Sequence, residues 1–308
     1  MIIVACPGQG SQTPGFLTPW LEVPEYRTHL EQLSEFAGMD LVAHGTTSNA
    51  DTIRDTAVAQ PLIVAASLLA WQALSASADT RSVSLAGHSV GEFAAASAAG
   101  VLTPADALSL VRVRGEAMAD AAASEPTGMV AVVGGSESDV LEAIAQADLE
   151  PANMNGAGQI VAAGSSASLA LLAENAPRGS RVIALQVAGA FHTRYMLPAV
   201  ETLRAAAASV AATDPTHTLW TNRDGTTITS GIVYRDLLVG QVSSPVRWDL
   251  CMAAFQAAGI TGLIELAPAG ALTGIAKRGL RGIPTVAVKT PEDLAAAVEL
   301  LSSELPDA

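Results

Sequence analysis

The sequence predicts an α/β protein in which a small lobe is inserted into a larger one. Two short apolar runs, Ile2–Cys6 and residues 82–86, each end at a glycine-containing turn, and an apolar helical stretch follows the second turn. This strand–turn–helix order is typical of α/β folds, and apolar runs without alternation indicate strands buried on both faces of a parallel sheet. From about residue 125 the order becomes βαββαβ, which is the ferredoxin-like motif.

The individual elements follow from local patterns. Pro61 favours the first turn of a helix over residues 61–74, and Thr103 with Pro104 is a typical start for a helix that continues to about residue 123. The other elements expected in the larger lobe are strands at residues 216–221, 262–266 and 285–288 and helices at 92–99, 197–212, 248–258 and 272–278. In the small lobe we expect strands at 129–133, 150–155, 159–163 and 181–187 and helices at 137–146 and 166–173. The larger lobe then comprises residues 1–124 and 190–308, and the small lobe residues 125–189.

Composition argues against several classes of protein. The 308 residues are 50% hydrophobic and carry a formal net charge of −14, so neither a disordered chain nor general affinity for nucleic acid or anionic lipid is expected. With only Cys6 and Cys251, a disulfide framework is excluded and a cytoplasmic location is expected. Residues 57–74 are apolar but include polar side chains such as Gln60, which favours a buried helix over a membrane span, and no export signal is recognised.

The segment Gly87-His88-Ser89-Val90-Gly91 has the G-x-S-x-G form of a nucleophile elbow. Glycines on both sides permit a strained turn between strand and helix that exposes the Ser89 hydroxyl. The amide of Val90 and the positive end of the following helix then face the oxyanion that forms when the serine attacks a carbonyl group. The position between an apolar strand and an apolar helix favours an elbow over a chance match in a chain with 26 glycines.

An activated serine needs a base, and the chain has five histidines. His88 is adjacent to Ser89, but neighbouring side chains on a tight turn usually diverge. His29 lies among polar residues, as expected of a solvated helix position. His192 follows the last expected strand of the small lobe, where a loop can bring it to the elbow. For each histidine the alternative is an ordinary surface or core position.

Arg114 lies in the helix expected over residues 104–123. At about 100° per residue it falls among Ala107, Val111 and Met118 on the apolar face, whereas Arg112 falls on the polar face. A guanidinium that points into the protein is costly unless an anion meets it. Two partners are possible: an acidic side chain of the protein itself, or the carboxylate of a substrate held by two hydrogen bonds. Periodicity does not distinguish them.

The glycine-rich turn after the first strand reads Pro7-Gly8-Gln9-Gly10-Ser11-Gln12. Its glycines allow the main chain to approach a ligand closely, and the amide of Gln9 is a candidate second donor to an oxyanion. The turn matches neither G-x-G-x-x-G nor a P-loop, so it is not expected to bind nucleotide phosphates. No group of His, Cys, Asp or Glu has the spacing of metal ligands.

Taken together, these stretches resemble the malonyl-CoA:acyl-carrier-protein transacylase family along essentially the whole chain. The motifs that support the resemblance are Pro7–Gln12, Ala59-Gln60-Pro61-Leu62, Gly87–Glu92, Arg112-Val-Arg114-Gly115, Asn153-Met-Asn155, Gly189-Ala-Phe191-His192, residues 241–248 (Gln-Val-Ser-Ser-Pro-Val-Arg-Trp) and Leu272-Thr-Gly274. The resemblance implies a large α/β-hydrolase-like lobe with a parallel sheet and a small inserted ferredoxin-like lobe, in agreement with the order of elements above.

The resemblance also implies roles for single residues. Ser89 is the acylated nucleophile, His192 is its base, and the main-chain carbonyl of Gln241 orients the His192 ring. The backbone amides of Gln9 and Val90 form the oxyanion hole. The implied substrate-binding residues are Arg114, which holds the free malonyl carboxylate, and Phe191, Gln60, Asn155 and Met118; in this family Phe191 accompanies malonyl rather than methylmalonyl.

The implied activity is transfer of malonyl from malonyl-CoA to the phosphopantetheine thiol of acyl carrier protein in fatty acid biosynthesis, by a monomer without bound cofactor or metal. The carrier is normally acidic, so docking needs a local cationic surface. The first candidates are Lys277, Arg278 and Arg281, and the second are Arg178 and Arg181. The alternatives are a pathway-specific polyketide acyltransferase, an acyl-CoA thioesterase or esterase, and a docking protein without catalysis. The usual hydrolase order of serine, acid and then histidine argues against the thioesterase.

Overall fold

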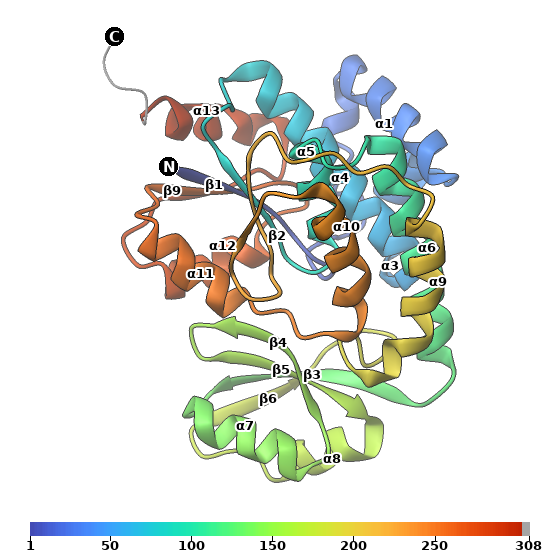
Figure 1. Cartoon of the computed structure of the whole chain (residues 1–308), viewed down its shortest axis with the longest axis vertical. Coiled ribbons are helices and arrows are strands. Elements are labelled where there is room, and N and C mark those ends of the chain that lie inside the picture. Colours follow the sequence, from blue (N-terminus) through green and yellow to red (C-terminus); the bar gives the residue numbers. More distant parts are fainter. Residues whose placement is uncertain (304–308) are drawn as a thin grey trace.

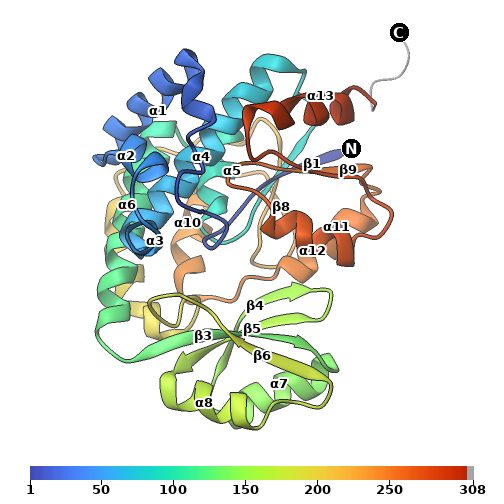
Figure 2. The same ribbon diagram turned by 180° about the vertical axis from the view of Figure 1, so that it is seen from behind.

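The computed structural model describes residues 1–303 and contains two separate β-sheets. A six-stranded sheet lies within the larger unit, and a four-stranded sheet with two helices lies beneath it in Figure 1 and, from behind, in Figure 2. The predicted class, an α/β fold with a parallel sheet and a ferredoxin-like unit, is confirmed. Residues 304–308 of the expected larger lobe lie outside the described residues.

The six-stranded sheet has the order β10-β9-β1-β2-β7-β8. Neighbouring strands are parallel except β7 and β8, which are antiparallel. All of β1 is buried because alternate side chains enter different cores: Val4 belongs to the core with α4 and α5, and Ile3 to the core with α11 and α12. The strands are β1 (Ile2–Cys6), β2 (Ser84–Gly87), β7 (Thr218–Trp220), β8 (Thr227–Ile228), β9 (Gly262–Glu265) and β10 (Thr285–Ala287).

Helices cover both faces of this sheet. Those of the larger unit are α1 (Pro24–Ala37), α2 (Leu41–Thr46), α3 (Ala50–Arg54), α4 (Thr56–Ser77), α5 (Gly91–Ala98), α6 (Pro104–Ala123), α9 (Leu197–Ala207), α10 (Gly231–Gly240), α11 (Trp248–Ala257), α12 (Ala271–Gly279) and α13 (Leu294–Ser302). Four short 3₁₀ turns, Trp20–Glu22, Arg194–Met196, Gln241–Ser243 and Pro291–Asp293, complete the regular structure of the described residues. Helices α1, α2, α3, α10 and α13 were not among the expected elements.

Helix α4 begins earlier than expected. The prediction placed Pro61 in its first turn, but the helix starts at Thr56, because the Asp55 side chain accepts a hydrogen bond from the Ala57 amide and caps it. By length and hydropathy α4 is long enough to cross a membrane. However, 78% of its most apolar window is buried, and it packs against α6, α5 and α1 as a core helix does.

The four-stranded sheet is antiparallel, with the order β4-β5-β3-β6. Together with one helix after β3 and one after β5, this is the ferredoxin-like arrangement that the βαββαβ order predicts. Both helices lie on the face turned away from the larger unit (Figure 1). The elements are β3 (Thr127–Gly134), α7 (Glu137–Gln146), β4 (Glu150–Gly156), β5 (Gln159–Ser165), α8 (Ser166–Glu174) and β6 (Ser180–Ala184).

Two expected elements end early. The strand predicted over residues 181–187 stops at Ala184, because after the bond from the Leu185 amide to Met129 the chain turns away and residues 185 and 187 line a cavity. The helix predicted over residues 197–212 stops at Ala207. Beyond it the amide of Thr213 bonds to the Val101 carbonyl, in the loop between α5 and α6, instead of continuing the helix.

The two units are joined by main-chain hydrogen bonds close to the site described below. The amide of Met154 in β4 donates to the Val246 carbonyl at 2.8 Å, and the Val246 amide donates to Ala152 at 2.9 Å. Arg194, two residues after His192, forms an ion pair with Glu150 of β4 at 2.7 Å. These contacts fix the small sheet against the segment that follows Gln241.

Candidate active site

Ser89 lies on a strained turn between β2 and α5. Its φ of 53° is in the left-handed region, which a non-glycine residue adopts only where its surroundings impose it. The two glycines of the motif are needed for space. A Cβ on Gly87 would lie 2.2 Å from the Glu92 nitrogen, and one on Gly91 would lie 2.1 Å from the Cys6 carbonyl oxygen. The G-x-S-x-G pattern is therefore a steric requirement of this turn.

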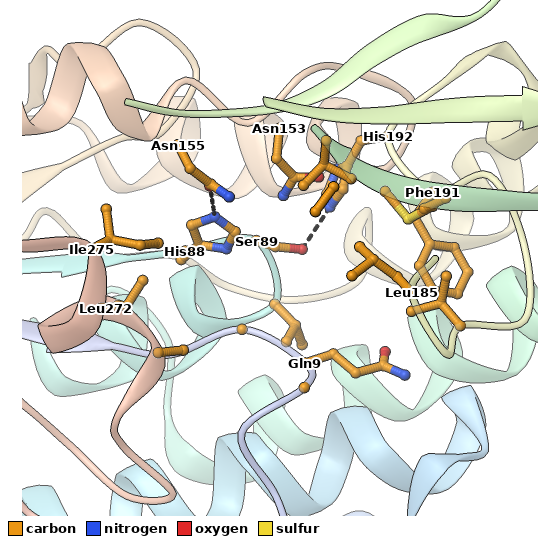
Figure 3. A pocket seen from close by; sticks show the side chains of 18 of the residues that line it. Gln9, His88, Ser89, Asn153, Asn155, Leu185, Phe191, His192, Leu272 and Ile275 are labelled. Atoms are coloured by element: carbon orange, nitrogen blue, oxygen red, sulfur yellow. Dashed lines mark hydrogen bonds between the residues drawn. The ribbon is translucent and has the colours of Figure 1, made fainter. Parts of the chain in front are cut away.

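His192 reaches the serine from the loop that leaves the small sheet. Its Nε2 lies 2.7 Å from the Ser89 Oγ, and its Nδ1 lies 2.9 Å from the main-chain oxygen of Gln241 (Figure 3 shows the first contact). Because a carbonyl oxygen only accepts, Nδ1 carries the proton and Nε2 accepts the hydroxyl proton. Among the described residues no carboxylate contacts the ring, so the Gln241 carbonyl takes the place of the acid in a serine–histidine–acid triad.

The surroundings keep His192 neutral. Burial, followed by the positive charge of Arg114, lowers the pKa of His192 from 6.5 to about 3. A neutral imidazole can accept the serine proton over the whole neutral range, which a general base requires.

Arg114 is buried, with 1% of its surface exposed, and its guanidinium faces the same serine. Its Nη1 donates to the Gln60 side-chain oxygen at 2.5 Å, and its Nη2 donates to the Gln241 side-chain oxygen at 2.9 Å and to Ser89 Oγ at 3.4 Å. Of the two partners that periodicity left open, an acid of the protein is not the one found: within residues 1–303 Arg114 contacts amides and a hydroxyl but no carboxylate.

One nitrogen of the Arg114 guanidinium has no hydrogen-bond partner among the described residues. Arg114 Nε is buried and makes no hydrogen bond to any described residue. The Nε–H and Nη2–H groups form one edge of the guanidinium, which can hold a carboxylate through two parallel bonds. Burial lowers the pKa of Arg114, and the charge of Glu92 opposes that change. An anion entering beside Ser89 would satisfy both the charge and the free donor.

The expected oxyanion-hole residues meet at the ends of two adjacent strands. Cys6 of β1 pairs with Gly87 of β2, so the Gly8–Gly10 turn and the elbow leave the same edge of the sheet. Gln9 and Val90 line the cavity that contains Ser89, and Val90 precedes the first turn of α5. The Gln9 side chain donates to the Arg54 carbonyl at 3.4 Å and so turns away from the serine.

The remaining expected substrate-binding residues also border this cavity. Gln60 donates to the Met118 sulfur at 3.4 Å as well as accepting from Arg114. His88 points away from Ser89 and pairs with the Asn155 side chain at 2.9 Å (Figure 3). His88 and Ser89 therefore diverge, as expected of neighbours on a tight turn.

The cavity has a volume of about 540 Å³. Ser89, His192 and Arg114 form one polar region of its wall. The small sheet contributes an apolar wall that includes Met129 and Val161, and the chain after it adds Val187. Leu185 and Phe191 complete this wall (Figure 3). A cavity of this kind, between two units and with a few convergent polar groups, is typical of a substrate site.

Exposed cationic side chains occupy the two positions considered for carrier docking. Lys277 and Arg278 occupy the last turn of α12, and Arg281 follows it; all three are exposed, and none forms an ion pair with another described residue. Arg278 also lines the cavity. Arg178 and Arg181, the second candidates, are exposed at the start of β6. No group of three or more metal-ligating side chains was found within residues 1–303.

Sequence reasoning did not identify two residues that structure this site. Glu92, 1% exposed, accepts from the Gln241 side-chain amide and from the Asn222 backbone amide. The Asn222 side chain accepts from the Ser89 amide at 3.1 Å. A signal for Glu92 existed, since it is the only charged residue of the short apolar helix α5. Asn222 has no comparable signal because it lies in a loop between strands β7 and β8.

Comparison with known proteins agrees with this geometry. The acyl transferase domain family matches residues 4–299. The malonyl CoA-acyl carrier protein transacylases of Mycobacterium tuberculosis and Escherichia coli are 53% and 32% identical to the chain, each over 96% of its length and over 98% and 97% of their own. The crystal structure of the M. tuberculosis enzyme superposes with a TM-score of 0.93 at 52% identity, covering 97% of this chain and 99% of that one.

A further structural relative is a malonyl-transacylase in complex with its type II PKS acyl-carrier protein. It matches with a TM-score of 0.92 at 28% identity, covering 97% of this chain and 99% of that one. The match to the domain family, the identity to relatives over nearly the full length and the similarity of the folds all agree. The chain belongs to the acyl transferase family, among the malonyl CoA-acyl carrier protein transacylases.

Proposed function

We propose that this enzyme transfers the malonyl group of malonyl-CoA to the phosphopantetheine thiol of acyl carrier protein through a malonyl ester on Ser89, in fatty acid biosynthesis. The proposal depends above all on the buried guanidinium of Arg114, which forms no ion pair with any described residue and whose Nη2 lies 3.4 Å from the Ser89 hydroxyl. A nucleophile beside a fixed cation suits an acyl group that carries its own carboxylate. The names of the relatives agree with this substrate.

In the first half of the reaction His192 Nε2 takes the hydroxyl proton as Ser89 Oγ attacks the thioester carbonyl carbon. The backbone amides of Gln9 and Val90 stabilise the resulting oxyanion, and loss of one such donor typically costs about 3–4 kcal/mol. The C–S bond then breaks, and the proton on His192 passes to the sulfur of coenzyme A. The product is malonyl-Ser89, and the Gln241 carbonyl holds the imidazole in one tautomer throughout.

In the second half the thiol of the carrier's phosphopantetheine arm gives its proton to His192 Nε2 and attacks the ester carbonyl. The tetrahedral intermediate collapses, the bond to Ser89 Oγ breaks, and the proton returns to the serine. Both pantetheine arms arrive with the substrates, so the reaction needs no resident cofactor. Phe191, Gln60, Asn155 and Met118 border the acyl site and restrict its shape in this proposal.

The decisive test is incubation with malonyl-CoA followed by intact mass measurement. We expect one covalent malonyl increment, located on the Ser89 peptide after digestion and missing in Ser89→Ala. Free malonate is measured in the same samples. Rapid malonate release without a carrier would indicate a thioesterase instead, and no increment with no turnover would indicate a docking protein.

For the carrier we propose a docking surface formed by Lys277, Arg278 and Arg281. The enzyme carries a net charge of −14, so an acidic partner needs a local positive patch, and these exposed side chains have no acidic partner among residues 1–303. We expect reversal of all three to glutamate to raise the carrier KM about tenfold at low salt, with less effect as salt screens the charges.

The matched variant reverses Arg178 and Arg181 on the small sheet. Its carrier KM is expected to stay near that of the wild type, and a rise there alone would move the docking surface to β6. A carrier KM unchanged in both variants would contradict electrostatic docking at either patch. Replacing the fatty acid carrier by a polyketide carrier in the same assay decides between the two pathways.

We also propose that residues 1–124 and 190–303 form one lobe and residues 125–189 the other. The four antiparallel strands between Thr127 and Ala184 support this division. A cytoplasmic monomer that binds neither nucleic acid nor membrane is consistent with the acidic charge and with two free, buried cysteines.

A further inference from the structure

Glu92 is a buried carboxylate outside the substrate cavity. Its Oε1 accepts from the Asn222 backbone amide at 2.6 Å, and its Oε2 accepts from the side-chain amide of Gln241. It forms no ion pair with any described residue, although an isolated buried charge is costly. Its position is therefore maintained by hydrogen bonds, and both bonds lead to residues that contact Ser89.

The bonds from Gln241 have a definite direction. Arg114 Nη2 donates to the side-chain oxygen of Gln241 at 2.9 Å, and the side-chain nitrogen of Gln241 donates to Glu92 and to the Ser89 carbonyl at 3.0 Å. The carboxamide thus lies between a cation and an anion, with its oxygen towards the first and its nitrogen towards the second. If the Gln241 carboxamide were flipped, its NH₂ group would face the N–H groups of Arg114, and both are hydrogen-bond donors.

We propose that Glu92 is a positioning residue that fixes the orientation of the Gln241 carboxamide and so holds Arg114 in place for the carboxylate of the acyl group. The inference rests on the proposed function, in which Arg114 binds that carboxylate. Glu92 does not line the substrate cavity and does not contact Ser89 Oγ, so its effect on Arg114 passes through Gln241.

A count of donors explains why a carboxylate is needed at position 92. Each oxygen accepts at least one hydrogen bond, Oε1 from the Asn222 backbone amide and Oε2 from the Gln241 side-chain amide, and Thr221 adds a further donor. A glutamine at position 92 would present its NH₂ group to one of these donors. Either that donor then has no acceptor, or the Gln241 carboxamide flips. Burial raises the pKa of Glu92 to about 7, and the hydrogen bonds that it accepts from Asn222, Gln241 and Thr221 oppose that rise.

The test is Glu92→Gln, with kcat and KM measured for malonyl-CoA and for acetyl-CoA, which has no carboxylate for Arg114. We expect the ratio of malonyl to acetyl kcat/KM to fall at least about tenfold, mainly through a higher malonyl KM, because one buried donor is misplaced. A purely structural role would lower both activities together and leave the ratio unchanged.

Glu265→Gln is the matched control. Glu265 is also buried, and it accepts from the amides of Gly270, Leu272 and Thr273 at the start of α12, with no bond to Arg114 or Gln241. We expect it to lower the melting temperature while its malonyl-to-acetyl ratio stays at the wild-type value. An equal fall in the ratio for both variants would overturn the proposal.

Gln241→Ala removes the side chain that connects Glu92 to Arg114. It keeps the main-chain carbonyl that orients His192. It is expected to reproduce the fall in the ratio, and adding Glu92→Gln to it should cause no further fall. It also tests the proposal if Glu92→Gln does not fold. The inference alone would be overturned if the malonyl-to-acetyl ratio were unchanged in a folded Glu92→Gln or Gln241→Ala variant. It would also be overturned if the falls in the ratio of the two single variants multiplied in the double variant. A wild-type enzyme that does not prefer malonyl would overturn the proposed function with it.

Discussion

Replacing Arg114 by alanine is expected to lower malonyl transfer by about 10²- to 10³-fold, which corresponds to roughly 3–4 kcal/mol of lost transition-state binding. The guanidinium is buried beside Ser89 with Nε unpaired, so the substrate carboxylate would be its one anionic partner among the groups described. Acetyl transfer does not use this contact and should change little or increase. The measurement is kcat/KM for both acyl-CoA donors with the same acceptor.

Arg112→Ala is the control for this variant, because Arg112 lies on the same helix but is half-buried at the surface and paired with Glu116 at 3.1 Å. It should keep both activities. Equal losses of malonyl and acetyl transfer in Arg114→Ala, or a phenotype shared with Arg112→Ala, would refute a carboxylate-binding role for Arg114.

Replacing His192 by alanine is expected to lower the rate of acyl-enzyme formation by about 10⁴-fold, since the Ser89 hydroxyl then has no base. The measurement is a single-turnover experiment with malonyl-CoA, followed by mass spectrometry. His217→Ala serves as the control, because that side chain contacts Thr216 and Trp71, far from the elbow in sequence and outside the lining of the cavity. A rate near that of the wild type in His192→Ala would exclude it as the base.

The pH dependence tests the same assignment. Burial and Arg114 hold the pKa of His192 at about 3, so wild-type acylation by acetyl-CoA, which has no carboxylate for Arg114, should stay nearly constant as the pH falls from 8 to about 5. A nearby positive charge disfavours protonation of the imidazole, so removing it raises the pKa. In Arg114→Ala with acetyl-CoA the acid limb should therefore move to higher pH than in the wild type with acetyl-CoA, and an unmoved limb would contradict this coupling.

Much of the fold could be predicted because its signals are local. Fully apolar β1 and the βαββαβ order of the small unit depend on runs of a few residues, and both predictions are confirmed by the two sheets. The helices that were missed have weaker signals. In α1 only Leu30, Leu33 and Ala37 are buried within a polar helix, and α10 is a ten-residue helix whose start is marked only by the Ser230 cap.

The ends of elements were less predictable because competing contacts decide them. Asp55 rather than Pro61 sets the start of α4, through a cap that depends on a single side chain. The chain leaves the small sheet at Ala184 because residues 185 and 187 pack into the cavity wall. Neither the start of α4 nor the end of β6 can be read from the hydrophobic pattern, because the same apolar side chains are buried whichever residue ends the element.

By itself, the sequence determined the elbow and the inward direction of Arg114. The elbow follows from sterics within a few residues, since no Cβ fits at Gly87 or Gly91, and the inward arginine follows from helical periodicity. Only the tertiary structure decided which groups meet there. Ser89 and His192 are 103 residues apart, and Gln241 is a further 49, so their approach depends on how the two sheets pack. The same packing places the side-chain amides of Gln60 and Gln241, and no acidic side chain, against Arg114. Helical periodicity shows that Arg114 points inward, but residues distant in the sequence decide which groups it meets there.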